Sequence, residues 1–224
     1  MLTKNQEKLI RSLQTKKGRE ESGLCLAEGK KVIEMAGDLV EYTFRESDTS
    51  VFAKLVTTEA PQTEAAVVRI PTWDRETLLA KRVIVVLDGV QDPGNVGAIL
   101  RLCLGFDAGL ILIESADVTN PKVIRSSAGA MFKVPSMNVP RAEAENSLKE
   151  MNRAIYRLEK RKGSVPISDA LFNAPLLLVA GSEGKGIQLD SPGASVHIEH
   201  ASALESLNVA NALAIALYSI FPIK

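Results

Sequence analysis

Apolar runs alternate with amphipathic segments through the second half of the chain. The run "RVIVVLD" (residues 82–88) is almost continuous and β-branched, which is typical of a strand buried on both faces of a parallel sheet. Further strands are predicted at residues 110–114, 154–159, 175–180 and 195–199, and residues 133–137 are expected to be short and extended. Helices are predicted at residues 95–108, 120–132, 141–152 and 206–221. This alternation predicts right-handed βαβ units and an α/β fold with a parallel sheet covered on both faces.

The first 80 residues show a more mixed pattern. Helices are predicted at residues 5–17 and 28–36, with strands at 24–27 and 64–70. Residues 49–55 fit one or two helical turns, and no regular element is predicted at residues 37–48. The stretch "PTWDRETLLAKR" (residues 71–82) is interpreted as a linker with some helical character. We therefore expect two domains, residues 1–80 and 81–224.

Composition and charge limit the classes of function. A hydrophobic content of 46% and a charged content of 24% indicate a globular protein with a substantial core. The formal net charge is zero, so the whole molecule has no strong field for polyanions. Residues 1–31 nevertheless carry eight Lys/Arg against four Glu, and residues 149–162 carry six against two, whereas residues 32–80 carry four against nine acids. Such basic patches are compatible with RNA or DNA, although solvated charged faces are the commoner explanation.

Cysteine usage and the absence of obvious targeting signals suggest a location. Cys25 and Cys103 have no partners at metal-ligand spacing, so we interpret them as thiols of a reducing compartment and predict no metal site. The first residues lack the apolar core of a signal peptide. The longest apolar run is interrupted by Asn211 and Ser219 and is too short to span a bilayer. We expect a cytoplasmic protein with no membrane partner.

The segment "LDGVQDPGNVGAILR" (residues 87–101) places polar residues where a predicted strand ends, the usual location of ligand sites in open α/β sheets. Residues 92–94 form a tight turn, and Asn95 fits a helix N-cap, so a purely structural role is one explanation. A cap does not explain Arg101, which lies in a helix whose other faces are apolar.

Two further segments follow predicted strands. In "VAGSEGKGI" (residues 179–187), three closely spaced glycines allow a ligand to approach the backbone, although an ordinary glycine-rich loop remains the alternative. Their spacing fits neither the dinucleotide-binding fingerprint nor the Walker loop. In "SLNVANALAIAL" (residues 206–217), Ser206 is compatible with simple helix capping. The chain has two histidines, His197 and His200, and neither is assigned a catalytic or metal-binding role.

Together, in this order and separation, the three segments resemble motifs one, two and three of the SpoU/TrmH branch of the SPOUT RNA 2′-O-ribose methyltransferases. Residues 121–135 resemble the family's segment between motifs one and two, and "LAEGKKVIEMA" (residues 26–36) resembles the start of its L30e-like substrate-binding domain. The resemblance implies a parallel-sheet domain with a C-terminal trefoil knot, preceded by a small α+β, L30e-like domain. The latter is expected to be shortened, because little chain lies between Met35 and Phe52.

The resemblance also implies an activity and its residues. It implies S-adenosylmethionine-dependent 2′-O-methylation of RNA by a homodimer, with 23S-type ribosomal RNA favoured. Methylation of transfer RNA and a catalytically silent RNA-binding assembly factor are the alternatives. The implied catalytic residues are Asn95, Arg101, Glu183, Ser206 and Asn208. The implied cofactor-binding residues are Val179, Ala180, Gly181, Gly186, Ile198 and Leu207.

The resemblance also implies a role for Arg101 in the reaction. The family assigns the corresponding arginine to removal of the proton from the ribose 2′-hydroxyl. A free guanidinium cannot act as a base, so we favour a role in clamping a phosphate and orienting the hydroxyl. Residues 198–202 read "IEHAS" where the family has an I-P-M-x-G-like run, which changes the side chains expected beside the cofactor.

Overall fold

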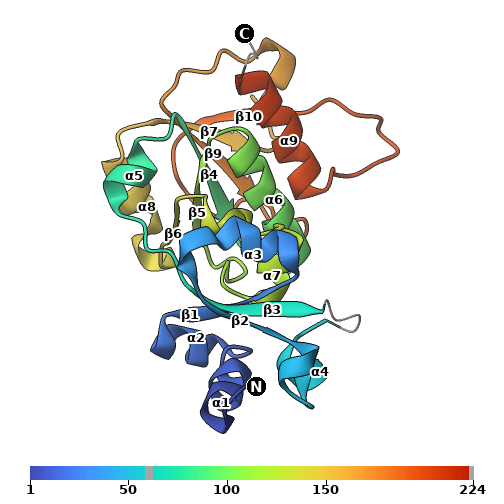
Figure 1. Ribbon diagram of the computed structural model, residues 1–224. Helices are drawn as coiled ribbons and strands as arrows, with labels where there is room; N and C mark the ends of the chain where they lie inside the picture. The colour runs from blue at the N-terminus through green and yellow to red at the C-terminus, as the bar shows by residue number, and fades with distance from the viewer. Residues whose placement is uncertain (59–62, 222–224) are drawn as a thin grey trace.

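The computed structural model describes residues 1–58 and 63–221, and within them the chain forms two sheets (Figure 1). The smaller sheet is antiparallel and contains β1 (Leu24–Glu28), β2 (Val40–Arg45) and β3 (Glu64–Arg69) in the order β1-β3-β2. The larger sheet contains β4 (Val83–Asp88), β5 (Gly109–Ile113), β6 (Ser136–Asn138), β7 (Ala154–Leu158), β8 (Val165–Pro166), β9 (Leu176–Gly181) and β10 (Ala194–His197). All its pairs are parallel, in the order β6-β5-β4-β9-β7-β10-β8.

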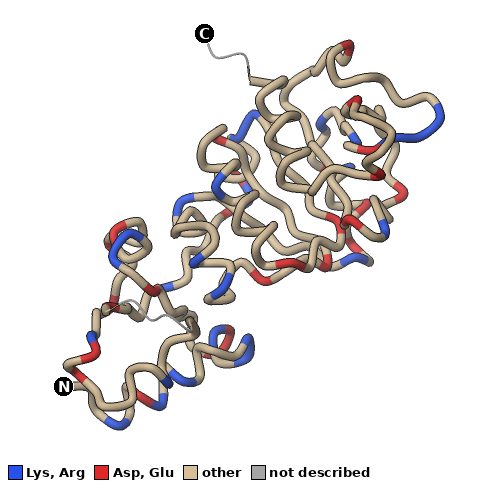
Figure 2. The backbone as a smooth tube through the Cα atoms, turned by 90° about the vertical axis from the view of Figure 1, so that its right-hand side faces the viewer, with Lys and Arg blue, Asp and Glu red and all other residues tan. Residues whose placement is uncertain are grey.

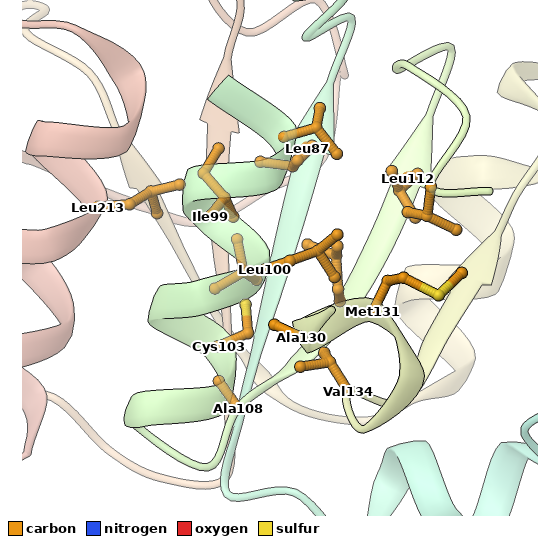
Figure 3. Close-up of a cluster of buried hydrophobic side chains, with 14 of the residues drawn as sticks. Leu87, Ile99, Leu100, Cys103, Ala108, Leu112, Ala130, Met131, Val134 and Leu213 are labelled. Carbon is orange, nitrogen blue, oxygen red and sulfur yellow. The ribbon is translucent and has the colours of Figure 1, made fainter. Parts of the chain in front are cut away.

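Helices cover both faces of the parallel sheet, which confirms the predicted α/β arrangement. One face carries α6 (Pro93–Gly105), α7 (Pro121–Ser126) and α9 (Val209–Ile220), and α3 (Lys30–Ala36) packs between this layer and the small sheet. The other face carries α5 (Arg75–Leu79) and α8 (Arg141–Glu150). The apolar strands serve both layers, because successive side chains point to opposite faces. Figure 3 shows Leu87 of β4 beside α6, with Leu213 of α9 on the far side of that helix, and Leu112 of β5 toward Met131.

The small sheet has a core of its own at one end of the molecule. Its helices there are α1 (Lys4–Ser12), α2 (Lys16–Ser22) and α4 (Phe52–Leu55). Ile10 and Leu55 pack with Leu26 and Phe44 of the sheet. Side chains on the opposite face of the small sheet join the core of the parallel sheet through α3.

Buried polar contacts connect the two sheets. Arg19 is 2% exposed, and its Nη2 donates to Asp117 Oδ2 at 2.6 Å. The buried carboxylate of Glu28 accepts hydrogen bonds from the backbone N–H of Thr57 at 2.8 Å and from Nη1 of Arg125 at 3.4 Å. These contacts hold residues 19–57 against the loops that follow β5. A domain boundary near residue 80 stays a prediction.

Several expected elements differ from those observed. The helix predicted at residues 5–17 is interrupted at Thr15, whose hydroxyl caps α2 by accepting from Gly18 N–H. The helix predicted at residues 120–132 ends early, because Ala128 and Gly129 adopt positive φ. Two further strands, β2 and β8, lie where no strand was predicted. Apolar Val40, Tyr42 and Phe44 alternate with exposed residues in β2, a period-two signal that identifies this strand.

The C-terminal ends of the parallel strands lie along one edge of the sheet. The three motif segments begin or end at this edge, after β4, β9 and β10. The trefoil knot stays a prediction, because strand order does not describe how the chain threads. Within the described residues, no helix is both long enough and apolar enough to cross a bilayer.

Candidate active site

Motif one turns directly from β4 into α6. The N-cap of this helix is Asp92, whose Oδ1 accepts from the backbone N–H of Asn95 at 2.8 Å. The suggestion that Asn95 is itself the cap is therefore wrong, because the helix already begins at Pro93. This leaves the side-chain amide of Asn95 free to contact another segment, and it donates to Glu183 Oε1 at 3.3 Å.

Motif two folds back on itself immediately after β9. The N–H of Gly186 donates to the carbonyl of Ser182 at 2.9 Å, and Gly186 has φ +64°. A Cβ atom on Gly181 would lie 2.1 Å from the carbonyl carbon of Gly186. Only glycine permits both the close approach and the positive φ. The two glycines thus make the tight loop that carries Glu183.

A buried carboxylate fixes the far end of this loop. Asp88 ends β4, and its Oδ2 accepts from the backbone N–H groups of Gln188 at 2.6 Å and Leu189 at 2.8 Å. Its Oδ1 accepts from Nη2 of Arg141 at 2.6 Å. Asp88 is not among the site residues expected from the sequence. An acidic residue at the end of a fully apolar strand is nevertheless a pattern that indicates a buried polar contact.

Motif three meets the other two motifs through one side chain. Asn208 is the N-cap of α9, and its Oδ1 accepts from the backbone N–H groups of Ala210 at 3.0 Å and Asn211 at 3.3 Å. Its Nδ2 donates to Asn95 Oδ1 at 2.9 Å and to Glu183 Oε1 at 2.8 Å. The three motifs therefore converge in an Asn95–Glu183–Asn208 cluster. Ser206 is not the cap of α9.

Arg101 lies outside this cluster. It is exposed and lines a shallow groove of about 350 Å³ between α6 and α9, with Ala98 and Asn211 among its neighbours. Six helical positions separate it from Asn95, which corresponds to about 9 Å along the axis and a different face. Its guanidinium makes no hydrogen bond or ion pair within the part of the chain that the structure describes.

Two cavities flank the motif-two loop. The large cavity, about 800 Å³, lies at the ends of β4, β5 and β9 and is lined by Asn95 and Glu183. The small cavity, about 290 Å³, lies at the ends of β7 and β10 and is lined by Ile198, Ser206 and Leu207. Residues 182–185 of the motif-two loop line the large cavity, and none of them lines the small one. The structure thus brings Asn95, Glu183 and Asn208 together in one cluster. It places Ile198, Ser206 and Leu207 at the small cavity and leaves Arg101 apart.

Two of the expected cofactor residues lie in the core. Val179 and Ala180 are buried in β9 and line neither cavity. Val179 packs toward α5 and α8, whereas Ala180 packs toward α9. Their side chains thus face opposite layers, so only backbone atoms at the end of this strand are available to one common ligand.

Charged and titratable groups surround the small cavity. Burial raises the pKa of the Glu159 carboxyl, but hydrogen bonds from Arg157 at 2.7 Å and Ser195 at 2.8 Å outweigh this effect and hold the pKa below its usual value. Both histidines, His197 and His200, also line this cavity. No cluster of three or more potential metal ligands exists within residues 1–58 and 63–221.

Comparison with known proteins places this site in a family. Residues 82–218 match the SpoU rRNA Methylase family. The chain belongs to this family. The resemblance predicted from the three motifs is thereby confirmed, together with the mixed α/β fold and the RNA methyltransferase class.

Relatives and solved structures match most or nearly all of the chain. The 23S rRNA (guanosine(2553)-2′-O)-methyltransferase RlmP of Bacillus subtilis (strain 168) is 29% identical over 241 residues, covering 96% of each chain. A 23S rRNA (uridine(2479)-2′-O)-methyltransferase of Streptomyces viridochromogenes is 31% identical over 172 residues, covering 71% of this chain and 60% of the relative. The structure of the SpoU methyltransferase AviRb from Streptomyces viridochromogenes, in complex with the cofactor AdoMet, superposes with a TM-score of 0.81 at 25% identity and covers 97% of each chain.

Proposed function

We propose that this protein transfers the methyl group of S-adenosylmethionine to a ribose 2′-hydroxyl of 23S rRNA. The convergence of Asn95, Glu183 and Asn208 from three distant segments is the observation that carries the proposal. Relatives that carry the names of 23S rRNA 2′-O-methyltransferases support the substrate class. They favour ribosomal RNA over transfer RNA and an active enzyme over a silent assembly factor.

The residues of the small cavity suit the cofactor. Its volume of about 290 Å³ is near the lower end of the usual range for small-molecule sites. Ile198 and Leu207 offer an apolar wall for adenosine, and the ionised carboxylate of Glu159 complements a cationic ligand. Backbone groups of the loop from Gly181 to Gly186, at the end of the strand that carries Val179 and Ala180, would complete the site. When bound, S-adenosylmethionine supplies a methyl group already activated by its sulfonium charge.

Alignment of the attacking hydroxyl is the main task left to the protein. A sulfonium methyl needs little further activation, so holding the reactants in line supplies much of the rate. Glu183 Oε1 accepts from both Asn95 and Asn208, which fixes this carboxylate in place. Its Oε2 bonds to no described residue and is available to accept from the ribose 2′-hydroxyl. Ser206 borders the cofactor side of this arrangement.

Arg101 acts as a phosphate clamp in this proposal. Its free guanidinium can bind a phosphate oxygen pair in bidentate fashion, which positions the ribose. Apolar side chains lie around it on α6 and α9: Leu104 is 39% exposed, Ile215 40% and Tyr218 65%. A second copy of the chain that covers this apolar face would form a homodimer with Arg101 at its interface, and the RNA would bind across the two copies.

Mapping of 2′-O-methyl groups in total RNA, with and without the protein, tests the function. We expect one site in 23S rRNA that depends on the protein. The Arg101→Ala variant should lose about 100-fold or more in methyl transfer, because an unpositioned ribose reacts slowly. Calorimetric binding of S-adenosylhomocysteine should be largely retained.

Three other outcomes would contradict parts of the proposal. A protein-dependent site in transfer RNA would replace the substrate. Tight RNA binding without any methylated site would favour the assembly factor. Full methyl-transfer activity of Arg101→Ala would contradict the proposed role of Arg101 as a phosphate clamp.

A further inference from the structure

The large cavity contains polar side chains that no step above uses. They are Gln91, Glu114, Arg141 and Gln188. Because Asn95 and Glu183 also line this cavity, a nucleotide whose ribose reaches Glu183 extends its base into this space.

Arg141 is held in one orientation by two carboxylates. Its Nη2 donates to the buried Asp88 at 2.6 Å, and its Nε donates to Glu114 Oε2 at 2.5 Å. These hydrogen bonds raise the pKa of Arg141, so it stays charged. Its Nη1 donates to no atom of the described residues. Both N–H donors of Nη1, on a rigid guanidinium, therefore remain for a ligand.

Two glutamines supply acceptors that are also fixed. Nε2 of Gln91 donates to the carbonyl of Glu114, and Nε2 of Gln188 donates to the carbonyl of Lys185 at 2.5 Å. Each contact uses the amide N–H and leaves the side-chain carbonyl oxygen as an acceptor. The cavity thus combines one oriented donor group with two oriented acceptors.

The charge of this cavity argues against a phosphate. Its acidic residues are Asp88, Asp92, Glu114 and Glu183, whereas its basic residues are Arg141 and Lys185. None of its described lining residues is aromatic, so a base here gains no stacking partner. These groups suit a neutral ligand that is recognised through its hydrogen-bonding edge.

We propose that the large cavity receives the base of the target nucleotide and selects guanine, with Arg141, Gln91 and Gln188 as specificity-determining residues. On its Watson–Crick edge guanine presents one acceptor, O6, and two donors, N1–H and the N2 amine. Arg141 Nη1 donates to O6, and the glutamine oxygens accept from N1–H and N2. Adenine presents a donor opposite Arg141, and uracil presents an acceptor in place of the N2 amine.

This inference rests on the proposed 2′-O-methylation and extends it to the base. Two relatives are named for a guanosine and a uridine target, so the base is not constant in the family. Base selection must therefore depend on residues other than those that perform the shared chemistry.

Transcripts that carry each of the four bases at the mapped site test the inference with the unmodified enzyme. We expect kcat/KM for guanosine to exceed that for adenosine, cytidine and uridine by about tenfold or more. Inosine, which keeps O6 and N1–H but lacks the N2 amine, should lie between guanosine and uridine.

Variants then assign the selection to side chains. Of Gln91→Leu and Gln188→Leu, the one that removes the acceptor for N2 should reduce the preference for guanosine over uridine by about fivefold. The one that removes the acceptor for N1–H should instead reduce the preference for guanosine over adenosine, because uridine also presents an N–H donor at that position. Gln14→Leu is the matched control, because Nε2 of Gln14 also donates to backbone carbonyls, at Lys54 and Leu55, far from this cavity. Arg141→Lys should lower kcat/KM on guanosine more than on adenosine. Because Arg141 also pairs with Asp88, the melting temperature of the variant shows whether the fold is intact.

The two proposals fail differently. A mapped target other than guanosine, or kcat/KM values within threefold for all four bases, would overturn base selection and leave the methyltransferase intact. An absence of any methylated site in cellular RNA would remove both.

Discussion

Asn208 uses one end of its side-chain amide to cap a helix and the other to bridge the motif segments. Its oxygen caps α9, and its nitrogen donates to Asn95 and Glu183. Both ends of the amide are occupied, so its orientation is fixed. A substitution that changes one end at a time separates stability from activity.

Asn208→Asp should keep the cap and lose the bridge. The carboxylate still accepts from the N-terminus of α9, where a negative charge is favourable, so the melting temperature should change little. Its second oxygen then faces Glu183, and repulsion between carboxylates at this distance should displace Glu183 and lower methyl transfer by about 100-fold.

Asn208→Ala is the comparison for this variant, because it loses both ends. It should lose activity and also about 1 kcal/mol of stability. Unimpaired methyl transfer in Asn208→Asp, measured with labelled S-adenosylmethionine, would show that the bridge has no role in the reaction.

The cysteines allow a second prediction at this scale. Burial raises the pKa of the Cys103 thiol to about 12 and that of Cys25 to about 12. The reactive thiolate is therefore absent at neutral pH in the folded protein. A thiol reagent should react with no cysteine in native buffer and with both cysteines of the sequence in guanidinium chloride. Rapid labelling in native buffer would indicate local opening of the core around α6.

At the scale of elements, the contacts between the small sheet and the parallel sheet are buried and polar. Arg19 and Asp117 form the most enclosed of the ion pairs described between them, with side chains 3% and 21% exposed. Burial raises the pKa of Asp117, but hydrogen bonds from Arg19 and Thr119 outweigh this and lower it below its usual value. The pair therefore stabilises the fold above the pKa of an unfolded aspartate, and this contribution is lost as the pH falls through the lower, folded pKa.

Asp117→Asn should destabilise the protein by about 3 kcal/mol at neutral pH, because it leaves a buried guanidinium without its counter-charge. The loss relative to the unmodified protein should shrink in acid, where Asp117 is protonated in both states. Urea unfolding at several pH values measures this. Glu150→Gln, which removes an exposed pair with Arg75 at 3.5 Å, should cost less than about 1 kcal/mol. Equal losses of unfolding free energy in the two variants would argue against a buried Arg19–Asp117 pair between the two sheets.

Sequence patterns located most elements but not their ends. The run of residues 82–88 identifies β4 because both faces of this strand are apolar. The start of α6 is missed by two residues, because Asp92 and Asn95 are both good caps and only the hydrogen bond distinguishes them. Motif spacing identified Glu183 and Asn208 but not Asp88 or Arg141, since neither has a local pattern that reveals a contact across 53 residues.

At the scale of the whole molecule, half of the basic residues in the two predicted patches already pair with an acid or a backbone carbonyl. In residues 149–162, Arg153 and Arg157 donate to the backbone carbonyls of Lys81 and Leu189, so they are structural. At the N-terminal end, Lys4, Lys8 and Arg11 are exposed on α1 and pair with no acid among the described residues. Their spacing of four and three places them on one face of this helix. Figure 2 shows Lys and Arg positions along the tube near the N-terminus.

Replacement of this stripe, Lys4, Lys8 and Arg11, by glutamine should weaken RNA binding and its salt dependence. Each lost phosphate contact lowers the slope of log K against log salt by about 0.7 to 0.9, so the triple variant should lose about two to three. Filter binding to a 23S rRNA fragment at several salt concentrations measures the slope.

Lys16→Gln with Lys17→Gln is the matched control. These lysines already pair with Glu20 at 3.6 Å and Glu21 at 3.7 Å, so the slope should change less. An unchanged slope in the triple variant would leave the stripe as an ordinary solvated surface.

The convergence of distant segments also has a consequence for protein synthesis. Asn95 and Asn208 are 113 residues apart, and the amide of Asn208 is fixed only once the backbone of Ala210 and Asn211 has formed the first turn of α9. A nascent chain in which every helix and strand before α9 has been synthesised still lacks its third motif. Translation must therefore run nearly to the end of this sequence before the polypeptide can act on any RNA, including that of the particle that makes it.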